Sequence, residues 1–141
     1  MGQIQRVQSI YLLVAAIIGS TLFGLPFATA PAQPEGMLVD GAFDINDHIA
    51  LIILTIVVVL LSFVTIFLYN NRVLQMNLGK LNIVLLLGLL GLAGYLFYTL
   101  PVATSLGLGL IVPVVVFVLI LLANRNIKKD EKLVRSADRL R

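Results

Sequence analysis

Cysteine, tryptophan and charge are the three things that this sequence lacks or has little of. The 141 residues contain no cysteine, which excludes a disulfide framework and a thiolate metal site. Without tryptophan, four tyrosines and seven phenylalanines must supply any aromatic belt. Charged residues make up 12% of the chain, against about a quarter in a typical soluble domain. With 60% hydrophobic residues and a mean hydropathy of +1.05, the composition indicates an integral membrane protein.

Four long apolar runs carry most of this hydrophobicity, and none contains Asp, Glu, Lys, Arg or His. A bilayer core of ~30 Å is crossed by roughly 20 helical residues, which is the length of each run. Apolar and polar residues do not alternate within the runs, which excludes transmembrane β-strands. The sequence therefore predicts an all-α membrane protein forming one domain over residues 1–141. We expect a four-transmembrane-helix bundle with spans at about residues 9–27, 49–69, 81–100 and 106–123.

The positions of the ten basic residues predict how the bundle is oriented. All lie before the first run, between the second and third, or after the fourth, whereas the connections 28–48 and 101–105 have none. By the positive-inside rule, both termini are expected in the cytoplasm and 28–48 forms an outer loop. The basic residues are Arg6, Arg72, Lys80, Arg125, Lys128, Lys129, Lys132, Arg135, Arg139 and Arg141.

The tail, residues 124–141, is predicted to be a cytoplasmic, amphipathic continuation of the fourth helix. Ile127, Leu133 or Val134, Ala137 and Leu140 fall on a narrow apolar stripe at helical spacing. Glu131 precedes Arg135 by four residues, the favourable order for a helical ion pair worth ~0.2–0.5 kcal/mol. Such pairs are weak, so we expect this helix to rest on its own cytoplasmic loop, on lipid headgroups or on a partner.

Two segments at the ends of the chain, Ile4–Leu13 (IQRVQSIYLL) and Asp130–Arg141 (DEKLVRSADRLR), resemble a known family. It is a family of small four-span bacterial membrane proteins, common in Bacteroidetes, called domain of unknown function 4293. The resemblance extends over the chain in length and span arrangement, but only these two ends are specific. It implies an inner-membrane protein, and it implies no reaction, cofactor or ligand.

Both family-like segments would lie on the cytoplasmic side of the membrane. Our hypothesis is that they form one polar surface that docks a partner. The alternative is that their basic residues only set the topology and contact anionic headgroups, at ~1 kcal/mol each. The candidate docking or headgroup-contact residues are Gln5, Arg6, Gln8, Ser9, Arg135, Asp138 and Arg139.

Gly88, Gly91 and Gly94 recur every three residues in the third run. Small residues let helix backbones approach closely, so we expect this face to pack on another helix of the same chain. Homodimerisation through the same face is the alternative. Pro113 lies within the fourth run, where the loss of a backbone hydrogen bond is expected to bend the helix.

The predicted interior contains hydroxyl side chains and no ionisable group, which disfavours proton-coupled transport and membrane hydrolysis. Hydroxyls satisfy neighbouring carbonyls or bridge helices at ~0.6 kcal/mol each. The hydroxyl residues expected in the spans are Ser20, Thr21, Thr55, Ser62, Thr65 and Thr99.

The outer loop holds the one metal-like grouping in the sequence, Asp40, Asp44, Asp47 and His48. Carboxylates and an imidazole could bind a divalent cation if these residues shared a helical face. The run from Asp44 to Asp47 is also typical of a turn followed by a helix start, in which Asp or Asn caps free N–H groups. We expect capping and predict no metal and no cofactor.

These features together favour a non-enzymatic accessory or scaffold subunit of a larger membrane complex. The alternative is a small permease or lipid-binding bundle, and an enzyme would require the outer-loop aspartates to converge with other polar groups. Expected partners are the lipid bilayer and membrane proteins or further copies of the chain. Nucleic acid is disfavoured because the basic tail also carries acidic residues and lacks aromatic ones.

Overall fold

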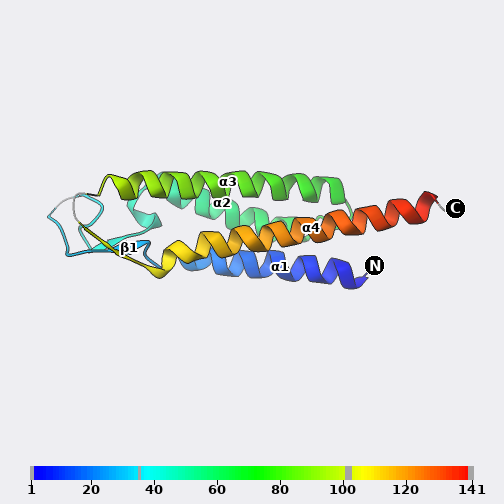
Figure 1. Ribbon diagram of the computed structural model, residues 1–141, viewed down its shortest axis with the longest axis horizontal. Helices are drawn as coiled ribbons and strands as arrows, with labels where there is room; N and C mark the ends of the chain where they lie inside the picture. The colour runs from blue at the N-terminus through cyan, green and yellow to red at the C-terminus, as the bar shows by residue number, and fades with distance from the viewer. Residues whose placement is uncertain (1, 35, 101–102, 140–141) are drawn as a thin grey trace.

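The computed structural model describes residues 2–34, 36–100 and 103–139, with side chains from Val7 onward. It is an elongated bundle of α1 (Gly2–Ser20), α2 (Ile49–Ile66), α3 (Arg72–Tyr98) and α4 (Ile111–Arg139). Short strands and loops gather at one end, which we call the loop end, and both chain termini lie at the other, the terminal end (Figure 1). α1 packs against α2 and α4, and α3 packs against the same two helices, so the four form a closed ring.

The helices meet along stripes of buried residues spaced alternately three and four apart. The stripe of α2 runs through Leu51, Thr55, Val58, Ser62 and Thr65, and α3 has a similar one. This spacing returns a side chain to the same face about every seven residues, as in left-handed helix bundles. The buried stripes therefore follow this repeat, and polar residues occupy several of its positions, where a soluble bundle would have leucine.

Within the described ranges, three helices are long and apolar enough to cross a membrane. They are α2, α3, and Leu108–Arg139, which joins α4 to the short 3-10 helix η3 (Leu108–Leu110). α1 and the 3-10 helix η1 (Thr21–Phe23) supply a shorter apolar helical segment, Val7–Phe23. The expected helical continuation of the fourth run is present, since α4 continues without interruption to Arg139.

The bundle exposes many large apolar side chains and buries several polar ones, unlike a soluble protein. On α2, Ser62 is fully buried, whereas Leu60 is 55% and Ile53 53% exposed. Water would penalise this arrangement, but hydrocarbon tails are as apolar as leucine and impose no such cost. The distribution is consistent with a membrane protein.

The third helix begins earlier than expected. The third span was expected to begin at about residue 81, after a connection, and that boundary is wrong because α3 starts at Arg72. Asn71 caps it, with Oδ1 accepting from the Leu74 N–H at 3.0 Å. The fourth helix in turn begins late, at Ile111. Pro113 thus lies in its first turn, where an N–H has no intrahelical acceptor, and the expected reason for a bend does not apply.

Three two-residue strands form a small antiparallel sheet at the loop end, which the all-α prediction did not include. β1 (Ala28–Thr29) lies between β2 (Ala42–Phe43) and β3 (Ser105–Leu106). The sheet joins the 28–48 loop to the segment before α4. Gly109 makes this approach possible, because a Cβ there would lie 2.6 Å from the Pro26 carbonyl oxygen.

The outer-loop aspartates cap a helix, as predicted. Asp44 begins the 3-10 helix η2 (Ile45–Asp47) in a capping box: its Oδ1 accepts from the Asn46 N–H at 2.9 Å, and its own N–H donates to Asp47 Oδ2 at 2.8 Å. His48 then caps α2 through Nδ1, which accepts from the Ala50 N–H. No group of three or more metal-ligating residues converges within the described ranges.

The pKa of the Asp47 carboxyl group lies above its ordinary value. Burial raises the pKa of Asp47, and the nearby charges of Asp44 and Asp40 raise it further. The backbone hydrogen bond from Asp44 acts in the opposite direction but does not cancel the increase.

The glycine stripe of α3 does not pack inside the chain. Gly88, Gly91 and Gly94 are exposed, and a Cβ built on any of them would meet no atom within 4 Å. The expectation of intramolecular packing is therefore wrong, because the buried stripe of α3 passes through Leu86, Leu89 and Ala93 instead. The homodimer alternative stays a prediction.

Candidate functional site

Most of the buried polar side chains lie on α1, the second half of α2, the start of α3 and the tail of α4. These segments lie toward the terminal end of the bundle (Figure 1). Gln75 lies at the centre of this region and is fully buried. Its Nε2 donates to the Thr65 carbonyl at 2.9 Å, and its Oε1 accepts from Gln8 Nε2 at 3.4 Å. One amide thus joins three helices, since Thr65 lies in the last turn of α2 and Gln8 lies on α1.

Asn82 forms a second polar contact two turns further along α3. Its Nδ2 donates to Ser62 Oγ at 2.9 Å and to the Val58 carbonyl at 3.4 Å. Ser62 in turn donates to the same carbonyl at 2.9 Å. The expectation of hydroxyls that satisfy their own helix carbonyls is confirmed at Ser62, while the amide that bridges the helices was not predicted.

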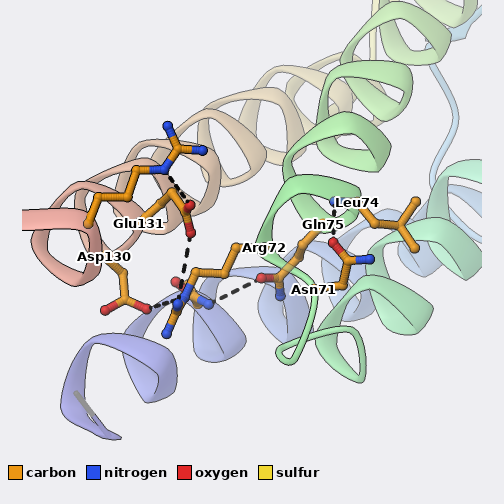
Figure 2. A network of polar contacts seen from close by, with 8 residues as sticks. Asn71, Arg72, Leu74, Gln75, Asp130 and Glu131 are labelled. Atoms are coloured by element: carbon orange, nitrogen blue, oxygen red, sulfur yellow. Dashed lines mark hydrogen bonds and ion pairs between the residues drawn. The ribbon is translucent and has the colours of Figure 1, made fainter. Parts of the chain in front are cut away.

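Ion pairs anchor the tail of α4 to the start of α3. Arg72 Nε donates to Asp130 Oδ2 at 2.7 Å, and Arg72 Nη1 lies 3.8 Å from Glu131 Oε2. The predicted helical pair is present as well, with Arg135 Nε 2.9 Å from Glu131 Oε1. Figure 2 shows Arg72 beside Asp130 and Glu131, with Gln75 one turn further along α3. The Asp130 side chain is only 1% exposed, so this carboxylate depends on Arg72 for charge compensation.

The predicted docking residues of α1 do not form an open surface. Gln8 is 1% exposed and engaged with Gln75, so its assignment to a docking surface is wrong. Its amide is held inside the bundle because a buried polar group needs an internal partner. Ser9 is half-buried and has a partner within the protein. The side chains of Gln5 and Arg6 lie outside the described part of the chain.

The predicted docking residues of the tail are open to the surroundings. Arg135, Asp138 and Arg139 are all exposed on α4. Of the two segments proposed to form one surface, only the tail has exposed polar side chains among the described residues.

Sequence reasoning missed the residues that build this region, namely Arg72, Gln75, Asn82 and Asp130. The first two were assigned to a connecting loop, and Asn82 was passed over inside an apolar run. A signal was present, because Gln75 and Asn82 continue the seven-residue spacing of the buried stripe of α3.

Comparison with known protein families gives a match over most of the chain. The profile of a family described as Domain of unknown function (DUF4293) matches residues 4–140, which confirms the resemblance of the two chain ends and extends it over nearly the whole sequence. No curated protein and no solved structure matches the chain.

Proposed function

The chain belongs to that family, whose description assigns no activity, and we propose that it is a non-enzymatic accessory or scaffold subunit of a membrane protein complex. In this proposal four helices cross an inner membrane, both termini lie in the cytoplasm, and the tail of α4 docks a partner. The observation that carries the proposal is the end of α4, which is helical, charged and exposed.

The packing of α1 supports the fourth span. This helix lies along α2 and α4 over the length of the bundle (Figure 1) and exposes Ile10 at 58% and Ile17 at 57%. Its 17-residue apolar part rises about 25 Å at ~1.5 Å per residue, close to the ~30 Å of a bilayer core. Because α1 is one of the four helices of the ring and exposes isoleucine side chains on its outer face, it belongs in the same lipid layer as its neighbours.

The charges at the two ends of the bundle support the proposed orientation. The described basic residues lie at the terminal end, whereas the loop end carries acidic residues, including Asp40, Asp44 and Asp47. Lys and Arg are retained on the cytoplasmic side of membrane proteins. The terminal end is therefore the cytoplasmic face in this proposal.

The shape of the tail supports docking. α4 extends past the ends of the other helices (Figure 1), and its residues from Lys132 to Arg139 are exposed except for the half-buried Val134. An isolated eight-residue helix is unstable in water, but this segment continues a long helix that Asp130 ties to Arg72. The result is a rigid projection with Leu133 55% exposed among charged residues, which suits contact with another protein.

The interior supports a scaffold over a permease. At the loop end it is filled by apolar side chains, including Phe27, Phe43, Leu51 and Leu89. At the terminal end Gln8, Gln75 and Asn82 form hydrogen bonds to one another, to Ser62 or to backbone carbonyls. A hollow of about 130 Å³ at the loop end, between α3 and the segments that precede α4, is lined by apolar side chains, including Phe97. Solute transport would require polar groups along a path, and those described here are used to join helices.

Purification of the tagged protein from its native membrane in mild detergent tests the proposal. We expect a membrane protein to co-purify in a fixed ratio, to be lost with the charge reversal R135E/R139E, and to be retained with the charge-preserving R135K/R139K. The single variant R139E separates docking from the Glu131 ion pair, because Arg139 has no ion-pair partner in the described ranges. An unchanged partner set in R135E/R139E would refute docking through the tail.

A further inference from the structure

A basic groove lies between α3 and α4 at the terminal end. It has a volume of about 470 Å³, within the ~300–1,000 Å³ typical of small-molecule sites. Lys80 of α3 and Arg125, Lys128 and Lys132 of α4 line it, together with Arg135, and Met76 contributes an apolar surface. The first four cationic side chains are exposed, and none of these four has an ion-pair partner among the described residues.

The acidic residue of the groove does not neutralise these four charges. Glu131 is already paired with Arg135 at 2.9 Å and lies 3.8 Å from Arg72. Because its charge is compensated on both sides, the groove keeps an excess of positive charge that attracts an anion.

The groove continues into apolar surface on both helices. Lys80 comes directly before the apolar run of α3, and Val84 and Leu87 follow it at spacings of four and seven, 62% and 54% exposed. On α4, Leu121 precedes Arg125 by four residues and is 43% exposed. Residues at these spacings share a helix face, so each cationic side chain lies above an exposed apolar stripe.

We propose that this groove binds an anionic phospholipid, with its phosphate among Lys80, Arg125 and Lys128 and its acyl chains along the apolar stripes of α3 and α4. The proposal shares with the proposed function the assignment of the terminal end to the cytoplasmic leaflet. Lysine acts on a phosphate as a point charge and arginine can bind it through two parallel hydrogen bonds. A free anion or an acidic peptide would use the charges but leave the apolar stripes without a role.

Native mass spectrometry of the purified, delipidated protein tests this site. The probes are phosphatidylglycerol, phosphatidylcholine with the same acyl chains, and inorganic phosphate. We expect one phosphatidylglycerol per chain to bind in preference to phosphatidylcholine. At ~1 kcal/mol per basic residue, K80Q/K128Q should weaken phosphatidylglycerol binding by roughly 10- to 30-fold. The matched control is K129Q, which removes the adjacent lysine of α4, an exposed side chain that does not line the groove.

The outcomes separate a lipid site from a free-anion site and from a general attraction of the basic tail for anions. Retention of binding in K80R/K128R together with near-native affinity in K129Q supports the site. Equal binding of the two lipids to the native chain would overturn the proposal, as would an equal loss in K129Q and K80Q/K128Q. If inorganic phosphate bound with an affinity similar to that of phosphatidylglycerol and displaced it fully, the groove would be a site for free anions instead. If K80Q/K128Q does not fold, the lipid site is still tested by the headgroup preference of the native chain and by lipid binding to K80R/K128R. Partner docking is measured separately with R139E, so either proposal can fail alone.

Discussion

The two partners of the Arg72–Asp130 ion pair differ in burial, so removing them should differ in cost. The Asp130 side chain is 1% exposed and the Arg72 side chain 19%. R72A leaves a buried carboxylate without its cation, a change that typically costs ~3–5 kcal/mol. D130A leaves an arginine that reaches solvent and still lies 3.8 Å from Glu131, so we expect a loss of about 1–2 kcal/mol, chiefly from one charge-assisted hydrogen bond.

The double variant gives the sharper test because the expected sign reverses. Adding D130A to R72A removes the uncompensated buried charge, so R72A/D130A should be more stable than R72A alone. The implied coupling is on the order of 1–3 kcal/mol. The free energy of unfolding can be measured in mixed micelles by titrating denaturing detergent, followed by far-ultraviolet circular dichroism, because the chain has no tryptophan for fluorescence.

E131Q is the matched control, since Glu131 is adjacent in sequence but 21% exposed and paired with the mostly exposed Arg135. We expect E131Q to cost less than ~1 kcal/mol, as exposed ion pairs do. If R72A cost no more than D130A, or if the two losses were additive in the double variant, the buried pair would not anchor the tail as described.

Four further substitutions test the packing and the charges elsewhere. G109A places a methyl group against the Pro26 carbonyl and should cost ~1–3 kcal/mol or more, whereas G91A on the open face of α3 should gain ~0.5–1 kcal/mol from helix propensity; equal effects of the two in the same unfolding assay would contradict the described contacts. Q75A removes an amide that joins three helices and should cost about 1–3 kcal/mol because buried polar partners lose their hydrogen bonds, so a neutral result would show that this amide is not buried as described. Burial raises the pKa of Asp47 above its ordinary 3.8. Ionisation of Asp47 therefore destabilises the folded state at neutral pH. This loss of stability disappears as the pH falls through the raised pKa towards 3.8, because the carboxyl group is then protonated. D47N should therefore be more stable than the native chain near neutral pH, and the difference in melting temperature should shrink on acidification; a difference that grows would refute the assignment.

Interactions within one or two helical turns could be predicted from the sequence. The capping of η2 by Asp44 and Asp47 and the pair between Glu131 and Arg135 follow from spacings of three and four residues, and both are present. The helical continuation of the tail was predictable for the same reason. Such features depend on local geometry, which the order of residues determines directly.

Features that depend on which helices meet could not be predicted in the same way. Gln8 was expected at a surface, but it is buried because α3 brings Gln75 against it. The glycines at 88, 91 and 94 were assigned to a contact because glycine is small, yet their spacing of three departs from the repeat through Gln75 and Asn82 that defines the buried face. A hydropathy profile does not reveal that repeat, because its positions near the terminal end include the polar amides Gln75 and Asn82.

The arrangement of four spans with both termini in the cytoplasm is tested most directly by single-cysteine labelling, which the absence of native cysteine makes clean. Gln3, Ala32, Asn70, Ala103 and Ser136 are each replaced by cysteine and treated in intact cells with a membrane-impermeant maleimide. We expect A32C and A103C to be labelled in intact cells. We expect Q3C, N70C and S136C to be labelled only after the membrane is permeabilised. Labelling of Q3C in intact cells while S136C stays protected would contradict the fourth span, and labelling of S136C in intact cells would contradict the orientation.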